Sequence, residues 1–145
     1  MRKIGLYFLI AVLGIYVVAV IVSAVLMAQM KQITYTSNAW GKIIMEAKID
    51  FTESRATRIY NDIYGELREQ KENPISDAKK TQIKAICSFS LFPIWRKNYN
   101  NPRIMDGDQY SIVRRYENSE SVIYGSNAYP LTYRFVYKAI YNAIE

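Results

Sequence analysis

The chain carries one uncharged stretch of 25 residues, Ile4 to Ala28, which reads IGLYFLIAVLGIYVVAVIVSAVLMA. An α-helix rises about 1.5 Å per residue, so this stretch reaches roughly 37 Å, whereas the hydrocarbon core of a bilayer is about 30 Å thick. A helix also pairs its backbone N–H and C=O groups within itself, as lipid requires. The stretch therefore predicts a transmembrane helix. We expect residues 1–30 to form an anchor that contacts membrane lipid through residues 4–28.

The charges beside this stretch predict its orientation. Arg2, Lys3 and the free amino group precede it, and only Lys31 follows closely. The positive-inside rule then places the N-terminus in the cytoplasm and the rest of the chain outside it, at a cell (inner) membrane. A signal peptide cleaved at Val22-Ser23-Ala24 is the alternative. The apolar core of a signal peptide usually has about 7–15 residues, so the length of this stretch favours an uncleaved anchor.

Two residues within the stretch are candidates for a contact between membrane helices. The hydroxyl group of Tyr16 is expected near mid-span, where it needs a hydrogen-bond partner. Gly14, two residues earlier, would let another helix approach closely. The alternative is a tyrosine that lipid simply tolerates.

Residues 31–37 are expected to form a polar neck, and residues 38–145 a single domain outside the cytoplasm. From 38 to 73, apolar residues recur at spacings of three and four, which predicts one long amphipathic helix. Asn73-Pro74 is expected to end it, because the residue before a proline disfavours helical geometry. A coiled-coil stem is the alternative to packing within the domain. The predicted stripe consists of Met45, Ile49, Thr52, Ala56, Ile59, Ile63 and Leu67.

Three further elements are expected in the domain. Asp77 is expected to cap a helix that ends near Leu91. Residues 109–116 and 121–126 are expected to form a β-hairpin with Tyr116 opposite Ser121, after a loop at 98–108. Residues 131–144 predict a final helix. The fold class is therefore α+β: a transmembrane helix followed by a small α-α-β-β-α domain with a long first helix and a β-hairpin.

The run Ala85 to Trp95, AICSFSLFPIW, is apolar but too short to span a bilayer. It is expected to be a buried helix end with an exit at Pro93. The alternative is an insertion into the lipid interface, with Trp95, Arg96 and Lys97 as the interfacial anchor.

The composition removes most kinds of catalytic site. The chain has no histidine and one cysteine, so it has no Ser-His-Asp triad, no histidine-bound zinc and no multi-thiolate metal site. Cys87 lies next to Ile86 and near Phe89, and we expect its thiol to be buried. The six glycines are scattered and form no phosphate-binding loop. We expect no catalytic residue, no cofactor and no metal, although a Ser–Lys pair stays open.

The formal net charge is +6. The excess is divided between residues beside the apolar stretch and residues 74–108, whereas nucleic-acid binding needs a concentrated basic face. Attraction to anionic lipid head groups is the better fit. No nucleic-acid partner is expected.

Tyrosine is the most unusual feature of the domain, with 13 residues in the chain. Tyr133, Tyr137 and Tyr141 recur every four residues along the predicted last helix, with Arg134 and Lys138 near them. Tyrosine is enriched at protein interfaces because it offers a large amphipathic area at low entropic cost. These five residues are therefore the candidate protein interface. The alternative is that the tyrosines only widen the stripe that faces the core.

The N-terminus, Met-Arg-Lys-Ile-Gly followed by a long apolar helix and a longer amphipathic one, resembles that of type IV pilins and pseudopilins. In that family a basic leader ends in glycine, and a glutamate follows five residues later. Gly5 matches the glycine, and Ile10 occupies the glutamate position. The resemblance covers about a third of the chain and implies a subunit that polymerises through its apolar helix after cleavage at Gly5.

The sequence thus predicts a membrane-anchored, non-catalytic protein whose domain binds another protein as an accessory, assembly or inhibitory subunit. Oligomers are compatible with this hypothesis. The pilin-like subunit is the first alternative. A secreted cationic effector or a Ser–Lys hydrolase is the second.

Overall fold

The computed structural model describes residues 2–39, 41–104 and 107–144. It contains three α-helices, one short 3-10 helix and a seven-stranded sheet, so the fold is mixed α+β. In chain order the elements are α1 (Arg2–Gln29), β1 (Gln32–Ala39), β2 (Lys42–Asp50), β3 (Arg55–Asn61), β4 (Leu67–Pro74), α2 (Asp77–Phe89), η1 (Phe92–Ile94), β5 (Asn98–Asn100), β6 (Gln109–Arg115), β7 (Glu120–Ser126) and α3 (Tyr133–Tyr141).

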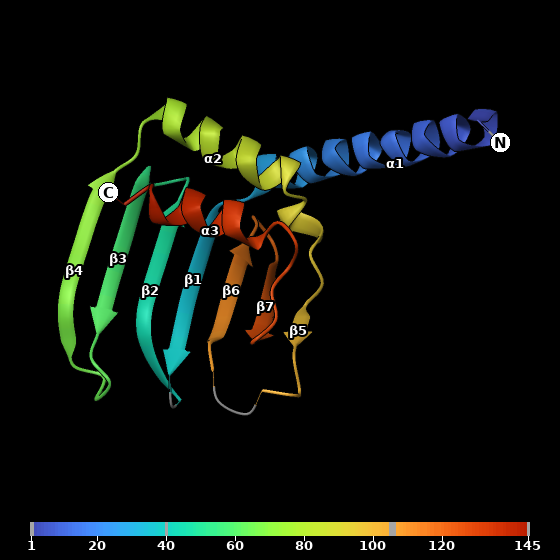
Figure 1. Ribbon diagram of the computed structural model, residues 1–145. Helices are drawn as coiled ribbons and strands as arrows, with labels where there is room; N and C mark the ends of the chain where they lie inside the picture. The colour runs from blue at the N-terminus through green and yellow to red at the C-terminus, as the bar shows by residue number, and fades with distance from the viewer. Residues whose placement is uncertain (1, 40, 105–106, 145) are drawn as a thin grey trace.

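The strands lie in the order β4-β3-β2-β1-β6-β7-β5. All neighbours are antiparallel except β5 and β7, which are parallel. Helices α2 and α3 cover one face of this sheet, and α1 extends away from it (Figure 1). The sheet therefore has an inner face under the helices and an outer face without a helix layer.

The described residues between 38 and 73 form strands joined by turns, and the prediction of one long helix there was wrong. In β2, Met45, Ala47 and Ile49 are buried, and the residues between them are only partly buried. This period of two is that of a strand with one face on a core. The predicted stripe was ambiguous because Met45 and Ile49 lie four residues apart, a spacing that fits both periods. The extra strands also remove the long amphipathic helix that contributed to the resemblance to pilins.

Two glycines mark turns that the helix prediction passed over. Gly41 lies between β1 and β2 with φ of 75°, and Gly65 lies between β3 and β4 with φ of 88°. Residues with a side chain rarely adopt such positive φ angles, so glycine is the default residue at these turns. Each glycine therefore lies at a turn inside the segment that the apolar spacing predicted to be one continuous helix.

Several smaller predictions also need correction. The polar neck expected at residues 31–37 lies in β1, and the loop expected at 98–108 begins with β5. Helix α2 is capped by Ser76, whose Oγ accepts the N–H of Lys79, and not by Asp77.

The hairpin of β6 and β7 is present, but its register differs from the prediction. Ile112 pairs with Ile123 and Arg115 with Glu120, so Tyr116 and Ser121 are not opposite each other. The last helix is confirmed in a shorter form, Tyr133–Tyr141, within the predicted range of 131–144.

The C-terminal end of α1 belongs to the core of the domain. Met27 and Met30 are each 1% exposed and pack in the same buried cluster as Ile33, Ile83 and Cys87. By contrast, each residue from 5 to 18 is exposed. The segment Gly5–Gln29 is long and apolar enough to cross a membrane. Figure 1 shows this helix leaving the domain beside the C-terminal end of α2.

A buried arginine joins the sheet to η1. Arg114 on β6 is 4% exposed, and its Nη1 donates to the carbonyl oxygens of Phe92 and Pro93 at 2.8 and 2.7 Å. Its Nε donates to Ser121 Oγ at 2.9 Å. These bonds compensate for the cost of burying the guanidinium group and hold η1 against the sheet.

The close packing of β7 against β6 yields a first prediction. A Cβ atom on Gly125 would overlap carbon atoms of the buried Tyr110 ring. We expect Gly125→Ala to lower the free energy of unfolding by about 1–3 kcal/mol, because overpacking forces the ring to move. Urea unfolding of the protein in detergent micelles measures this. Gly14→Ala is the matched control, since nothing lies within 4 Å of a Cβ there; equal stabilities for the two variants would contradict the packing.

Candidate functional site

The tyrosines of α3 face the sheet and form a ladder of rings. Tyr133, Tyr137 and Tyr141 stack in sequence, with centroid distances of 5.8 and 5.9 Å. The hydroxyl of Tyr133 donates to the hydroxyl of Tyr35 on β1 at 2.9 Å. Spacing of four residues places these rings on one side of the helix, one turn apart. The ladder therefore connects the last helix to the middle of the sheet.

Further tyrosines extend this cluster along the chain. Tyr110 on β6 stacks with Tyr35 at 6.2 Å and with Tyr129 at 5.1 Å. The hydroxyl of Tyr110 donates to the carbonyl oxygen of Ala128 at 3.0 Å. This bond ties the segment before α3 to the sheet, so the aromatic cluster has a fixed shape.

The cluster borders an open groove of about 740 Å³ between α3 and the sheet. We call it the tyrosine groove. Five rings line it, together with Ile44, Met45, Ile63 and the polar residues Ser37, Asn61, Asp62 and Asp108; the five are Tyr35, Tyr60, Tyr129, Tyr133 and Tyr137. An aromatic floor with a few polar groups at the rim is typical of binding sites.

The hydroxyl groups of the groove stay protonated well above neutral pH. Burial, with a smaller contribution from Tyr141, raises the pKa of Tyr60 to about 12. Burial and the nearby Asp108 raise the pKa of Tyr129 to about 12. Burial and the hydrogen bond to Tyr35 raise the pKa of Tyr133 as well. The groove therefore offers neutral hydroxyl groups.

The carboxylates are the charged groups of the rim. A hydrogen bond from the backbone N–H of Glu66 lowers the pKa of Asp62, and Arg68 lowers it further. Asp108 Oδ2 accepts the hydroxyl of Tyr129 at 3.1 Å. Aromatic faces together with carboxylates suit an apolar group that carries hydrogen-bond donors or a positive charge.

A buried arginine stabilises the far end of the ladder. Arg58 on β3 is 8% exposed, and its guanidinium carbon lies 5.1 Å from the ring of Tyr60 and 4.8 Å from that of Tyr141. Its Nη2 lies 3.9 Å from a carboxylate oxygen of Glu69. Cation–π contacts of this kind hold both rings in place. Tyr141 therefore supports the groove without lining it.

The structure separates the five residues of the predicted interface. Tyr133 and Tyr137 line the tyrosine groove, and Tyr141 packs on Arg58. Arg134 and Lys138 are exposed and do not line that groove. The tyrosines thus face the sheet, an orientation that agrees with the alternative in which they widen the stripe that faces the core. Tyr35, Tyr60 and Asp62 are members of the groove that sequence analysis missed, because they come from segments of unrecognised strands.

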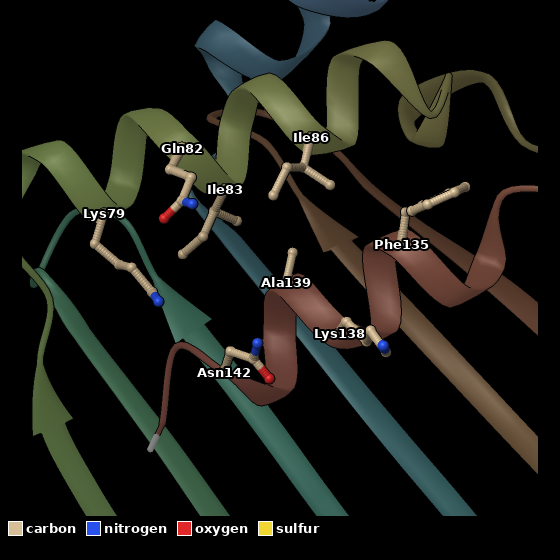
Figure 2. A pocket seen from close by; sticks show the side chains of 8 residues that line it. All are labelled: Lys79, Gln82, Ile83, Ile86, Phe135, Lys138, Ala139 and Asn142. Atoms are coloured by element: carbon tan, nitrogen blue, oxygen red, sulfur yellow. The ribbon is translucent and has the colours of Figure 1, made fainter.

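Lys138 lines a second, smaller groove between α2 and α3. This groove has a volume of about 210 Å³ and includes Ile86 and Phe135. Figure 2 shows Lys79, Gln82 and Ile86 on α2 opposite Phe135, Lys138 and Asn142 on or just after α3. Phe135 is 62% exposed. The groove is a shallow apolar seam with two lysines beside it.

The remaining candidates lie near α1. The hydroxyl of Tyr16 donates to the carbonyl oxygen of Phe89 at 2.9 Å, so its partner is the end of α2 in the same chain. Gly14 is exposed and has nothing within 4 Å of a Cβ position. Trp95 is 8% exposed and donates its indole N–H to Ser90 O at 2.9 Å. Arg96 and Lys97 are exposed.

Within the described ranges, no group of three or more histidine, cysteine, aspartate or glutamate side chains is placed to hold a metal ion. Cys87 is buried, and burial raises the pKa of its thiol to about 12. This thiol is therefore neither exposed nor ionised near neutral pH. The tyrosine groove is the candidate functional site.

Comparison with known proteins adds no family assignment. No protein-family model matches this chain, and no curated protein matches it.

The raised pKa values of the groove tyrosines predict how stability depends on pH. Unfolded tyrosine titrates near pH 10, whereas folded Tyr60 and Tyr129 titrate near pH 12. Between these two pH values the folded state keeps protons that the unfolded state has lost. The contribution of these two groups to the free energy of unfolding is therefore fully present below pH 10 and is lost as the pH rises toward 12. We expect the double variant Tyr60→Phe, Tyr129→Phe to show a shallower fall. Urea unfolding across this range measures it, and parallel slopes for variant and parent would contradict the assignment.

Proposed function

We propose that this chain is a single-pass membrane protein with its N-terminus in the cytoplasm and its domain on the other side. The domain binds another protein through the tyrosine groove, as an accessory, assembly or inhibitory subunit without catalytic activity. Three features support the proposal: the long apolar α1, the basic residues Arg2 and Lys3 at its N-terminal end, and the aromatic groove. The groove is the single observation that carries the binding function.

The surroundings of the groove favour a protein over a small molecule. Ile63 lines the groove and is 52% exposed. It continues into an apolar surface at the ends of β2, β3 and β4, which we call the tip patch. The tip patch consists of Ile43, Ile63, Tyr64 and Leu67, each at least 44% exposed.

The tip patch is held together by hydrogen bonds between neighbouring strands and turns. Asn61 Nδ2 donates to the carbonyl oxygen of Ile43 at 3.1 Å, and Lys42 Nζ donates to that of Tyr64 at 2.8 Å. A groove lined by tyrosines and extended by an exposed apolar patch is the composition of a protein interface core. Asp62 is already paired with Arg68, so Asp108 is the rim carboxylate that favours a partner with basic or hydrogen-bond-donating side chains.

The intact mass of the protein purified from membranes tests the anchor. We expect the full-length mass, because Ser23, which loss of residues 1–24 would remove, is buried against the domain. Loss of residues 1–5 would instead indicate a pilin-like subunit. Loss of residues 1–24 would indicate a released domain.

Site-specific photo-crosslinking in the native membrane tests the interface. A photoreactive amino acid at Ile63, in the tip patch, is expected to form adducts with one protein partner. The same probe at Tyr124, which is 58% exposed on the outer face of the sheet, is the matched control and is expected to form none. Tyr129→Ser should reduce the adduct at Ile63, because Tyr129 lines the groove. Equal adducts at both positions, or none at Ile63, would contradict the proposal.

A further inference from the structure

The length of α1 limits where the bilayer can lie. Residues 5–18 are each classed as exposed, and these 14 residues reach only about 20 Å at about 1.5 Å per residue. A hydrocarbon core of about 30 Å needs roughly 20 residues. If α1 spans the membrane as proposed above, about six more residues must lie within the apolar layer.

The residues of α1 after residue 18 are buried on the side of the helix that faces the domain and exposed on the opposite side. Ser23 is buried against the domain, whereas Ile21, Val22 and Val25 on the other side are 58%, 47% and 54% exposed. The outward surface of α1 thus stays apolar as far as Val25 while its inward surface already contacts α2 and η1. The apolar layer therefore extends past the point where the domain begins.

The contact between Tyr16 and Phe89 shows which part of α1 lies beside the domain. The hydroxyl of Tyr16 bonds to the carbonyl oxygen of Phe89 at 2.9 Å, which fixes the end of α2 beside Tyr16. Tyr16 precedes Val25 by nine residues, or about 14 Å along the helix. The end of α2 consequently lies well within the part of α1 that carries an apolar outer surface.

The surface of the domain at this level is apolar. Leu131 is 101% exposed, Phe89 63% and Ile94 45%. These three residues line one open cavity of about 820 Å³ together with Tyr16 of α1. We call Phe89, Ile94 and Leu131 the lipid rim. Three large apolar side chains exposed beside a membrane helix gain free energy by leaving water.

Positive charges surround the lipid rim. Arg96 lines the same cavity, Lys97 follows it, and Arg134 lies on α3 three residues after Leu131; all three side chains are exposed. Among the described residues that line this cavity, none is acidic. Apolar side chains bordered by arginine and lysine match the boundary between acyl chains and anionic head groups.

We propose that the lipid rim is inserted into the adjacent leaflet of the bilayer, with Arg96, Lys97 and Arg134 at the level of the head groups. The domain then rests on the membrane through side chains from α2, η1 and the segment before α3, in addition to its span. This inference depends on the membrane span of the proposed function but not on the protein partner. A second copy of the chain covering the same residues is the competing occupant.

Fluorescent labelling in vesicles tests the insertion. The full-length protein carrying Leu131→Cys is labelled with an environment-sensitive dye and placed in vesicles of phosphatidylethanolamine and phosphatidylglycerol. Native Cys87 is 0% exposed and needs no replacement; the unsubstituted protein checks that it stays unlabelled. Tyr124→Cys on the outer face is the matched exposed control, and Leu13→Cys in the free part of α1 reports the span.

We expect the dye at Leu131→Cys to show a blue-shifted emission and to be quenched by lipids with a nitroxide near the top of the acyl chain. The dye at Tyr124→Cys should be quenched by aqueous iodide only. Iodide quenching at Leu131→Cys, with lipid quenching retained at Leu13→Cys, would overturn the insertion and leave the anchor intact. Iodide quenching at both positions would overturn the span. Shielding of Leu131→Cys from both quenchers would assign the surface to a second copy and overturn insertion.

Discussion

The structure depends on the burial of the end of α1 in the core of the domain. Met27 and Met30 are part of the cluster that the sheet and α2 enclose. Backbone hydrogen bonds continue this attachment directly after the helix: Lys31 donates to Arg115 and accepts from Phe51, both at 2.9 Å. No flexible segment separates the helix from β1. The helix therefore sets the orientation of the domain, and with it the positions of the tyrosine groove and the lipid rim.

Helix α3 and the segment before it connect these two surfaces. Leu131 belongs to the lipid rim, and Tyr133 and Tyr137 belong to the groove, within seven residues of chain. The hydroxyl of Thr132 donates to Ser90 O at 2.7 Å, which ties this segment to the end of α2. Packing at Leu131 and the end of α2 therefore bears directly on the position of the groove tyrosines. If the groove binds a partner as proposed, its shape depends on how this end of the domain is packed.

Sequence patterns predicted the elements that have a single interpretation. The uncharged run before Gln29, the period of α2 and the adjacent apolar pairs Phe135/Val136 and Ala139/Ile140 of α3 each fit only a helix. Residues 38–73 could not be assigned in the same way, because Met45 and Ile49 lie four residues apart, a spacing that satisfies both helix and strand periods. The discriminating signals were Gly41 and Gly65, which need left-handed backbone angles. Tyr133 and Tyr137 were identified as site residues, but their partners Tyr35 and Tyr60 lie on strands and depend on long-range pairing that local spacing does not encode.

The two edges of the sheet constrain how a partner is recognised. Edge strand β4 carries both signs of charge, with Arg68, Glu69, Lys71 and Glu72 in close succession, and ends at Pro74. The other edge, β5, is three residues long. Charged or short edges oppose the addition of a foreign strand. Binding by main-chain pairing is thus disfavoured at both ends of the sheet. For the partner proposed above, affinity would have to come from side chains that fit between aromatic rings, so its sequence, rather than its ability to form a β-strand, would decide whether it is accepted.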